Sequence, residues 1–361
     1  MGRLSLRATN GYELRLNPGT MEVMSKQLSP AQANIERLVL MVDAASTILI
    51  LQPDSPDGDS MWTALGLEEI LGERGKTVVM YSYKEAEPYL RTYEGWDRVS
   101  QDMPNGFDFT IIVDTGSPSL IKSALEHHRA AITSKPVVVI DHHVSHQDFG
   151  FETIDIVQEA VATAEQVADI ALQAGWNINE SASYKLAAAI LSDSLNLTTS
   201  GTTTRTVEIM AELLRRGASM AELNRIRRQS SALEPDQVHL KGALLSSIKF
   251  LCDGRLAVAE IKPQVVADNK NKFEPYNMII SEMQWTRGVE LVAVFKNYGT
   301  KVNVPMRSTH GIAGPMAERM GGGGHPNAGA YRTESVDIEA ETNKLALAFI
   351  TFKAEHPDAV S

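Results

Sequence analysis

Short apolar segments, three of which run directly into acidic residues, most strongly constrain the fold of this chain. The segments are TILILQ (47–52), KTVVMYS (76–82), FDFTIIVDTG (107–116) and KPVVVIDHH (135–143). Helical patterns lie between them, among them MWTALGLEEILGERG (61–75) and SPSLIKSALEHHRAA (117–131). Strands that alternate with helices predict βαβ units. We therefore expect an α/β domain with a mostly parallel sheet flanked by helices.

A second, smaller domain is expected at the C-terminal end of the chain. There the pattern changes to two hairpins, IKFLCDGRLAVAEI (248–261) and VELVAVFKNYGTKVNVPMRS (289–308), followed by a glycine-rich loop. These features predict an α+β domain. The predicted division is a tail at 1–27, the first domain at 28–216, a helical connector at 217–245 and the second domain at 246–361.

The overall charge limits the kind of partner. The chain of 361 residues has a formal net charge of −11, whereas proteins that coat long nucleic acid usually present a basic surface. A short anionic substrate is compatible with this charge, and a long duplex is not expected. The sequence has no membrane-spanning apolar run or signal-peptide pattern, and its single cysteine, Cys252, excludes an intrachain disulfide. We expect a cytoplasmic protein without a membrane partner.

Several acids are expected to converge at one edge of the sheet, because ligands of open parallel sheets bind beyond the carboxyl ends of the strands. Three predicted strands and one apolar helix end near such residues: Asp57 and Asp59, then Asp114, then Asp141 with His142 and His143, and finally Asp193. Carboxylates packed closely repel one another unless a cation neutralises them. Oxygen ligands with some imidazole suit Mn²⁺ or Mg²⁺, and two such ions can promote phosphoester hydrolysis.

Each of these signals has a simpler structural interpretation. A single Asp after a strand more often caps a turn or helix than binds a metal, and Asp54 fits that interpretation. His146 is interpreted as a loop residue, and His127 with His128 as the solvated face of a helix. The combination of acids at several strand ends, rather than any one residue, favours a metal site.

Six segments together resemble a known family. They are PDGDS (56–60), IIVDTGSPS (111–119), VIDHHVSH (139–146), AAILSDSLNLTTSGTTTRT (188–206), MRS (306–308) and GGGGHPNAGA (321–330). In this order they resemble the motifs of the DHH/DHHA1 phosphoesterases. Within that family they are similar to the NrnA-like group of nanoRNases and 3′-phosphoadenosine 5′-phosphate phosphatases. The resemblance implies a catalytic DHH domain followed by a substrate-binding DHHA1 domain.

The resemblance also implies roles for individual residues. One Mn²⁺ would be bound by Asp57 and Asp114, and a second by Asp59, Asp114, His142 and Asp193. Asp141 would orient the ring of His142, and His143 would contact the scissile phosphate or assist the leaving oxygen. In the second domain the substrate would be bound by Arg307, Gly322, Gly323, Gly324 and His325. Arginine and glycine-rich backbone both suit phosphate, although a glycine run can also be a flexible linker.

The first motif departs from the family pattern, which places a metal-binding histidine three residues before the proline of Pro-Asp-Gly-Asp. Pro53 holds that place here, so Gln52 can replace the histidine only if one residue is inserted; Asp54 is another candidate. An amide oxygen is expected to bind Mn²⁺ more weakly than imidazole, which predicts a weaker first metal site. The fourth motif reads Ser-Asp-Ser-Leu where Thr-Asp-Thr-Gly is usual, but Asp193 is retained.

The function implied by the resemblance is a Mn²⁺-dependent phosphoesterase, with Mg²⁺ as an alternative ion. It would hydrolyse short oligoribonucleotides, 3′-phosphoadenosine 5′-phosphate, or both, through attack by a hydroxide held between two metal ions. Two alternatives are a nucleotide-binding regulatory protein with impaired catalysis and a linear or cyclic dinucleotide phosphodiesterase. Formation of a homodimer is left open.

Overall fold

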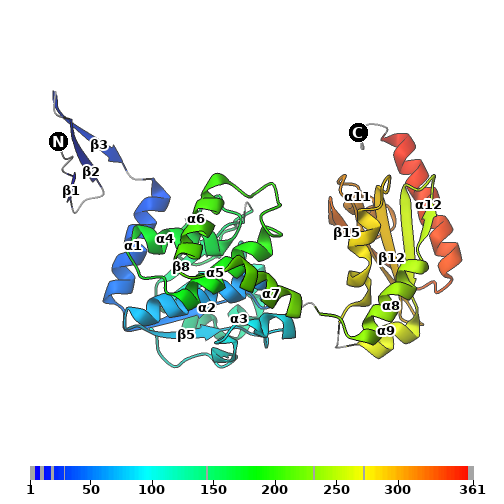
Figure 1. Ribbon diagram of the computed structural model, residues 1–361, viewed down its shortest axis with the longest axis horizontal. Helices are drawn as coiled ribbons and strands as arrows, with labels where there is room; N and C mark the ends of the chain where they lie inside the picture. Colours follow the sequence, from blue (N-terminus) through cyan, green and yellow to red (C-terminus); the bar gives the residue numbers. More distant parts are fainter. Residues whose placement is uncertain are drawn as a thin grey trace. The chain divides into compact units, whose positions relative to one another are not determined.

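The computed structural model in Figure 1 describes residues 29–143, 145–230, 232–270 and 273–356, and the backbone of 5–8, 12–17 and 20–27. The chain divides into two compact units, Met1–Ala232 and Leu233–Ser361. Where a tail was predicted, the structure has antiparallel strands β1 (Ser5–Ala8), β2 (Tyr12–Asn17) and β3 (Thr20–Gln27). In the sequence of β2, YELRLN, apolar and polar residues alternate, which is the period of a strand.

The first unit is built on a parallel sheet in the order β6–β5–β4–β7–β8–β9. Its strands are β4 (Thr47–Leu51), β5 (Thr77–Tyr81), β6 (Val99–Ser100), β7 (Phe109–Val113), β8 (Val137–Asp141) and β9 (Ile154–Val157). The apolar segments predicted as strands are confirmed, whereas β6 and β9 are too short to show a period. The strand order reverses between β4 and β7, and ligands of open α/β sheets bind at such a switch point.

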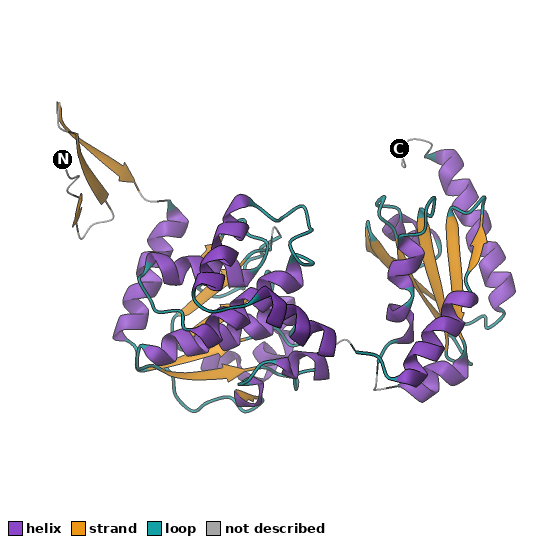
Figure 2. Ribbon diagram, viewed as in Figure 1, coloured by secondary structure: helices purple, strands orange, loops and turns teal. Residues whose placement is uncertain are grey.

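Helices cover both faces of this sheet (Figures 1 and 2). They are α1 (Pro30–Ala44), α2 (Gly58–Glu73), α3 (Lys122–Thr133), α4 (Thr163–Gln173), α5 (Glu180–Asp193), α6 (Thr204–Arg215) and α7 (Met220–Ser230), with 3₁₀ turns at Pro88–Thr92, Trp96–Arg98 and Pro118–Ile121. Successive residues of a strand face opposite sides. Ile48 and Ile50 accordingly pack with α2 and α4, and Leu49 and Leu51 pack with α3.

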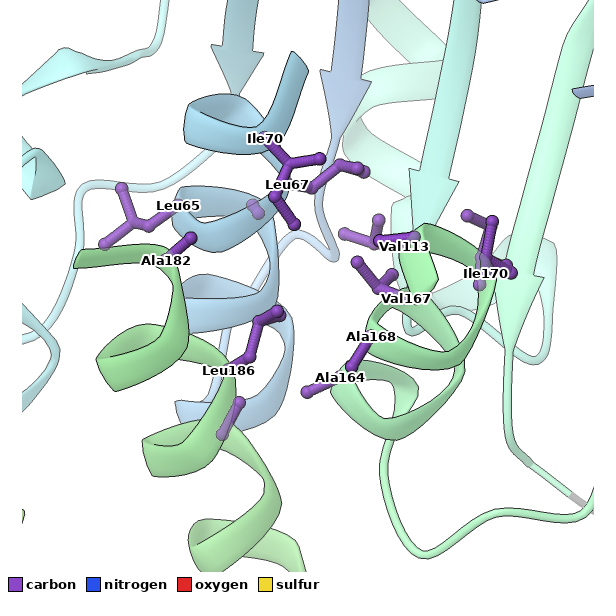
Figure 3. Close-up of a cluster of buried hydrophobic side chains, with 14 of the residues drawn as sticks. Leu65, Leu67, Ile70, Val113, Ala164, Val167, Ala168, Ile170, Ala182 and Leu186 are labelled. Carbon is purple, nitrogen blue, oxygen red and sulfur yellow. The ribbon is translucent and has the colours of Figure 1, made fainter. Parts of the chain in front are cut away.

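Helices α2 and α5 pack closely in an antiparallel pair, with Leu65, Ala182 and Leu186 at their contact (Figure 3). A Cβ atom on Gly66 of α2 would lie 2.9 Å from Leu186 Cδ2, so glycine is needed for this approach. The pairing places the end of α5, where Asp193 lies, beside the start of α2. It thereby brings two acids together that are far apart in the sequence.

The second unit has a mixed sheet in the order β10–β11–β12–β13–β15–β14. Its strands are β10 (Lys249–Leu251), β11 (Leu256–Ile261), β12 (Leu291–Asn297), β13 (Val302–Arg307), β14 (Gly323–His325) and β15 (Ala328–Thr333). Its helices are α8 (Pro235–Ser246), α9 (Pro263–Asn269), α10 (Ile280–Gln284), α11 (Ala313–Arg319) and α12 (Ile338–Glu355), with a 3₁₀ turn at Pro275–Met278. Both predicted hairpins are confirmed as antiparallel pairs.

Two details of this region differ from expectation. The glycine-rich segment is partly a strand, β14, which pairs with β15. A Cβ atom on Gly324 of this strand would collide with the carbonyl oxygen of Ala328, so glycine permits the close approach. The predicted helical connector is divided, with α7 in the first unit and α8 in the second. Among the helices that the structure describes, none is long and apolar enough to cross a membrane.

Candidate metal centre

Acids and imidazoles from separate elements meet at the carboxyl edge of the first sheet. His142 Nε2 lies 3.4 Å from Asp193 Oδ2, 3.5 Å from Asp114 Oδ1 and 3.9 Å from Asp59 Oδ2. Within the described part of the chain, two groups have ligand atoms close enough to share a metal ion: Asp59, His142 and Asp193, and Asp114, His142 and His143. These residues come from four elements: Asp114 directly follows β7, His142 directly follows β8, Asp59 lies in α2 and Asp193 ends α5.

Asp59 is fully buried in the first turn of α2 and also caps another helix. Its Oδ2 accepts the backbone N–H of Thr163 at 2.6 Å, and its Oδ1 accepts the N–H of Ala164 at 3.1 Å and the hydroxyl of Thr63 at 3.0 Å. The first N–H groups of a helix have no partner inside it and carry a partial positive charge. The start of α4 therefore stabilises the carboxylate.

Asp114 follows β7 in a left-handed backbone conformation with φ of 53°. Aspartate tolerates this conformation better than most residues. Its backbone N–H donates to the carbonyl of Ile140 on β8 at 2.9 Å, and its Oδ1 accepts the hydroxyl of Thr163 at 3.1 Å. The buried carboxylate is consequently held beside His142 by bonds to two neighbouring elements.

The electrostatics of this cluster favour added positive charge. Burial and the charges of Asp114 and Asp193 raise the pKa of Asp59 well above its usual value. Burial and the charges of Asp57 and Asp114 raise the pKa of Asp193 to about 6. Burial alone would lower the pKa of His142, but a hydrogen bond with Asp114 and the neighbouring carboxylates raise it to about 9. The cluster thus retains protons that a divalent cation would displace.

The predicted role of Asp141 toward His142 is wrong. Asp141, fully buried at the end of β8, accepts His143 Nδ1 on its Oδ1 at 2.6 Å. The ring of His142 is instead held by the carbonyl of Ala160, 3.2 Å from Nδ1. Residues 141 and 143 lie on the same side of the extended chain, whereas residue 142 points to the other side. Asp141 therefore orients His143.

Asp57 lies in neither metal-binding group of the described residues. It is exposed and caps α2, with its Oδ1 accepting the N–H of Ser60 at 3.0 Å. Its charge nevertheless contributes to the raised pKa of Asp193, which indicates that the two carboxylates are near each other. Its role as a ligand of the first metal ion stays a prediction.

Gln52 and Asp54, the two residues that could replace the metal-binding histidine of the family's first motif, differ in their surroundings. Asp54 caps α3, because its oxygens accept the N–H groups of Ser123 at 2.7 Å and Ala124 at 3.3 Å. The capping interpretation of Asp54 is thus confirmed. Gln52 follows β4, is fully buried, and neither polar atom of its amide has a hydrogen-bond partner among the described residues. A buried amide without a partner is costly, and a bound ion would give its oxygen a partner.

The donor set fits a hard divalent cation. The residues brought together supply carboxylate oxygens and one or two imidazoles, without a thiolate. The amide oxygen of Gln52 as a further ligand stays a prediction. Such ligands suit Mn²⁺ or Mg²⁺. The shared proximity of Asp59, Asp114 and Asp193 to one imidazole and the unpartnered amide of Gln52 are the observations on which this fit depends.

Two of the predicted substrate-binding residues of the second unit, Arg307 and His325, lie on one face of its sheet. Ala328 of β15 is paired with Arg307 of β13 on one side and with His325 of β14 on the other. Paired residues of antiparallel strands share a face, so the arginine and the histidine point the same way, about 10 Å apart. Asn327 joins the loops beside them, since its carbonyl accepts the N–H of Ser308 at 3.1 Å and its Oδ1 that of Gly311 at 2.9 Å.

Sequence reasoning missed several residues of the first-unit site. Thr163 contacts both Asp59 and Asp114, and Gln166 Nε2 donates to the carbonyl of Asp141 at 2.7 Å. His146, interpreted as a loop residue, has its Nδ1 3.1 Å from Asp141 Oδ2. Thr163 and Gln166 could have been found, because they are polar residues at the start of a helical pattern. The sequence held no signal for the partner of His146.

Comparisons with known proteins identify a matching family and several relatives. Residues 47–221 match the DHH family, N-terminal domain. The chain is 25% identical over 290 residues to the bifunctional oligoribonuclease and PAP phosphatase NrnA of Thermus thermophilus, covering 79% of this chain and 83% of that protein. It is 22% identical over 322 residues to the protein of the same name from Bacillus subtilis, covering 88% and 98%.

A solved structure with a similar fold is an exopolyphosphatase-related protein from Bacteroides fragilis. The TM-score is 0.76 at 18% sequence identity, and the match covers 90% of this chain and 96% of the other. At this identity the similarity concerns the fold.

Proposed function

From the match of residues 47–221 to the DHH family, we propose that this chain is a metal-dependent phosphoesterase acting on short nucleotides. Its substrates are short oligoribonucleotides, 3′-phosphoadenosine 5′-phosphate, or both. The names of the relatives from Thermus thermophilus and Bacillus subtilis support this substrate class. The observation that carries the proposal is the meeting of Asp59, Asp114 and Asp193 around His142 Nε2 within 3.9 Å.

The ion proposed for this site is Mn²⁺, with Mg²⁺ as the alternative. Asp59, Asp114, His142 and Asp193 would hold one ion, and Asp57 and Asp114, with the amide oxygen of Gln52, would hold another. Bound there, the two ions would offset the charge of the phosphate and lower the pKa of a water nucleophile. The chain's own contribution is to keep these ligands in place through Thr163 and the start of α4.

His143 is proposed to act on the phosphate or the leaving oxygen. Its Nδ1 is hydrogen-bonded to Asp141, and among the described residues its Nε2 has no hydrogen-bond partner, which leaves this atom available to a substrate. The hydrogen bond to Asp141 raises the pKa of His143 above its usual value, which favours the protonated ring. A protonated imidazole can bind a phosphate oxygen and donate a proton to the departing one. Its half-exposed position gives a substrate access.

In the second unit, Arg307, His325 and the glycines Gly322, Gly323 and Gly324 are proposed to bind the substrate. Arginine can donate two hydrogen bonds to one phosphate, and histidine adds a further donor. Their shared face of the sheet supports a common ligand. The glycines let the backbone of β14 lie close to β15, which places His325 in this row.

A substrate panel tests the proposal. Purified protein would be stripped with a chelator and reloaded with Mn²⁺ or Mg²⁺. It would then be given di- to pentaribonucleotides, 3′-phosphoadenosine 5′-phosphate, linear and cyclic dinucleotides, and a long duplex. We expect release of mononucleotides from the shortest substrates, or of phosphate from the nucleotide, and no turnover of the duplex. Inactivity of the reloaded protein on every short substrate would refute the proposal.

A second candidate function is a nucleotide-binding regulatory protein with impaired catalysis. The observation in its favour is the first motif, in which Pro53 stands where the family pattern has a metal-binding histidine. Isothermal titration calorimetry with Mn²⁺ and with a nucleotide separates the two candidates. Nucleotide binding with a full set of metal ions but no turnover would favour the regulatory protein.

A further inference from the structure

Asp141 is held by two imidazoles. His143 Nδ1 donates to its Oδ1 at 2.6 Å, and His146 Nδ1 donates to its Oδ2 at 3.1 Å. The carboxylate is fully buried, and its backbone carbonyl accepts a bond from Gln166. Both oxygens of this carboxylate, which is not among the residues grouped at the metal centre, are therefore engaged by ring nitrogens.

His146 is itself held in place although it lies in the segment between β8 and β9. Its side chain is only 18% exposed, and its ring packs against Phe149 with a centroid separation of 5.7 Å. Its Nε2 faces Asp155 Oδ2 on β9 at 3.6 Å. The ring thus lies between the end of β8 and the adjacent strand, and it is held by the hydrogen bond of its Nδ1 to Asp141 and by packing against Phe149.

The hydrogen bond from His146 to Asp141 affects how firmly Asp141 holds His143. A carboxylate with one oxygen engaged can turn about its bond to Cβ, whereas one with both oxygens engaged is fixed. Loss of the bond to Oδ2 would also leave a buried charged oxygen without a donor. The two hydrogen bonds consequently hold both oxygens of the carboxylate that orients His143.

We propose that His146 is a positioning residue for the phosphoesterase reaction: it fixes Asp141, and Asp141 in turn fixes the ring of His143. This inference rests on the function proposed above. It assigns His146 no contact with the substrate or the metal ions. Outer partners of this kind typically contribute a factor of about 10 to 100 to activity.

Two substitutions separate the hydrogen bond from the bulk of the ring. His146→Ala removes the donor. His146→Asn keeps an N–H donor near the position of Nδ1 and removes the ring atoms that face Asp155. The control is His127→Ala, which removes an exposed histidine of α3 whose Nδ1 contacts the carbonyl of Ser123. Thermal unfolding and calorimetric metal titration would verify that each variant folds and binds metal.

Kinetics on a dinucleotide give the first readout. We expect His146→Ala to lower kcat about 10- to 100-fold with little change in KM, His146→Asn to recover most of it, and His127→Ala to match the wild type. An unchanged kcat in His146→Ala would overturn the proposal. Equal losses in the alanine and asparagine variants would also overturn it, because they would show that ring packing and not the hydrogen bond matters.

A spectroscopic readout does not depend on turnover. The short, charge-assisted bond between His143 and Asp141 should give a far-downfield imidazole N–H resonance in the metal-free protein, identified by its loss in His143→Gln. We expect His146→Ala to broaden or shift this signal and His146→Asn to retain it. An identical signal in His146→Ala and the wild type would overturn the proposal. If the wild type turned over no substrate, the proposed function would fail while this measurement still decided the role of His146.

Discussion

The carboxylate of Asp59 accepts the backbone N–H of Thr163 at 2.6 Å, so a buried acid of the metal centre also caps helix α4. The α4 helix has Ala162 at its N-cap position, which offers no side-chain acceptor. Asp59 of α2, which precedes Thr163 by 104 residues in the sequence, supplies that acceptor. The candidate metal site and the start of α4 therefore share one side chain, and we expect substitutions at this position to affect both.

Two substitutions of Asp59 should separate these roles. Asn can still accept the N–H of Thr163, whereas Ala cannot. We expect both variants to lose metal affinity, and the free energy of unfolding of metal-free Asp59→Ala to be about 1 kcal/mol below that of Asp59→Asn. Urea unfolding in the presence of a chelator measures the difference. Equal stabilities would show that the bond to Thr163 does not contribute to the stability of α4.

Replacement of Asp114 should remove turnover while the fold persists. Asn is the suitable substitution because it tolerates the left-handed conformation with φ of 53°, whereas Ala would add backbone strain. We expect kcat to fall by at least about 100-fold, since even outer partners of metal ligands contribute 10- to 100-fold. Activity assays and circular dichroism spectra together measure this effect. Wild-type turnover in Asp114→Asn would refute the proposed shared ligand.

Gln52→His should strengthen the weaker metal site. Gln52 is fully buried without a hydrogen-bond partner among the described residues, and imidazole is a better ligand for Mn²⁺ than an amide. We expect two unequal Mn²⁺ sites in the wild type and a gain of about tenfold at the weaker one in the variant. Calorimetric titration of the wild type and of the variant with Mn²⁺ measures the affinities of the two sites. Asp54→Asn is the control, because Asp54 caps α3 and should not influence metal affinity.

The stability of the metal-free protein should depend on pH through Asp193. Its pKa is raised from 3.8 to about 6 by burial, Asp57 and Asp114, so across this range the folded protein binds more protons than the unfolded chain. Stability contributed by this group is therefore present at low pH and is lost as the pH rises through about 6. Asp193→Asn should gain thermal stability relative to the wild type between pH 4 and 6.

The control for this pH dependence is the metal-loaded wild type. Bound cations would offset the carboxylate charges, so the advantage of Asp193→Asn should vanish or reverse when metal is present. Melting temperatures of both proteins, with chelator and with Mn²⁺, test the point. A constant difference across this pH range in metal-free protein would contradict the raised pKa.

Much of the first unit could be predicted because its strands are apolar runs with clear ends. Strands β4, β5, β7 and β8 were predicted from such runs, whereas β6 (Val99–Ser100) and β9 (Ile154–Val157) are too short to show periodicity. The place of β9 determines part of the surroundings of His146, since Asp155 on this strand lies 3.6 Å from its Nε2. No local sequence pattern could predict that His146, a loop residue, would lie beside Asp155 on a strand that was itself not predicted.

The sequence by itself determined that acids follow β4, β7 and β8, and parallel strands necessarily bring such residues to one edge of the sheet. The tertiary structure decided which oxygen meets which nitrogen. In the folded chain Asp54 caps α3, and Asp59 caps the start of α4. Asp141 is hydrogen-bonded to His143 and His146 rather than to His142. The reason is physical: strand ends are positioned by topology, but side-chain partners depend on packing between elements that are distant in the sequence.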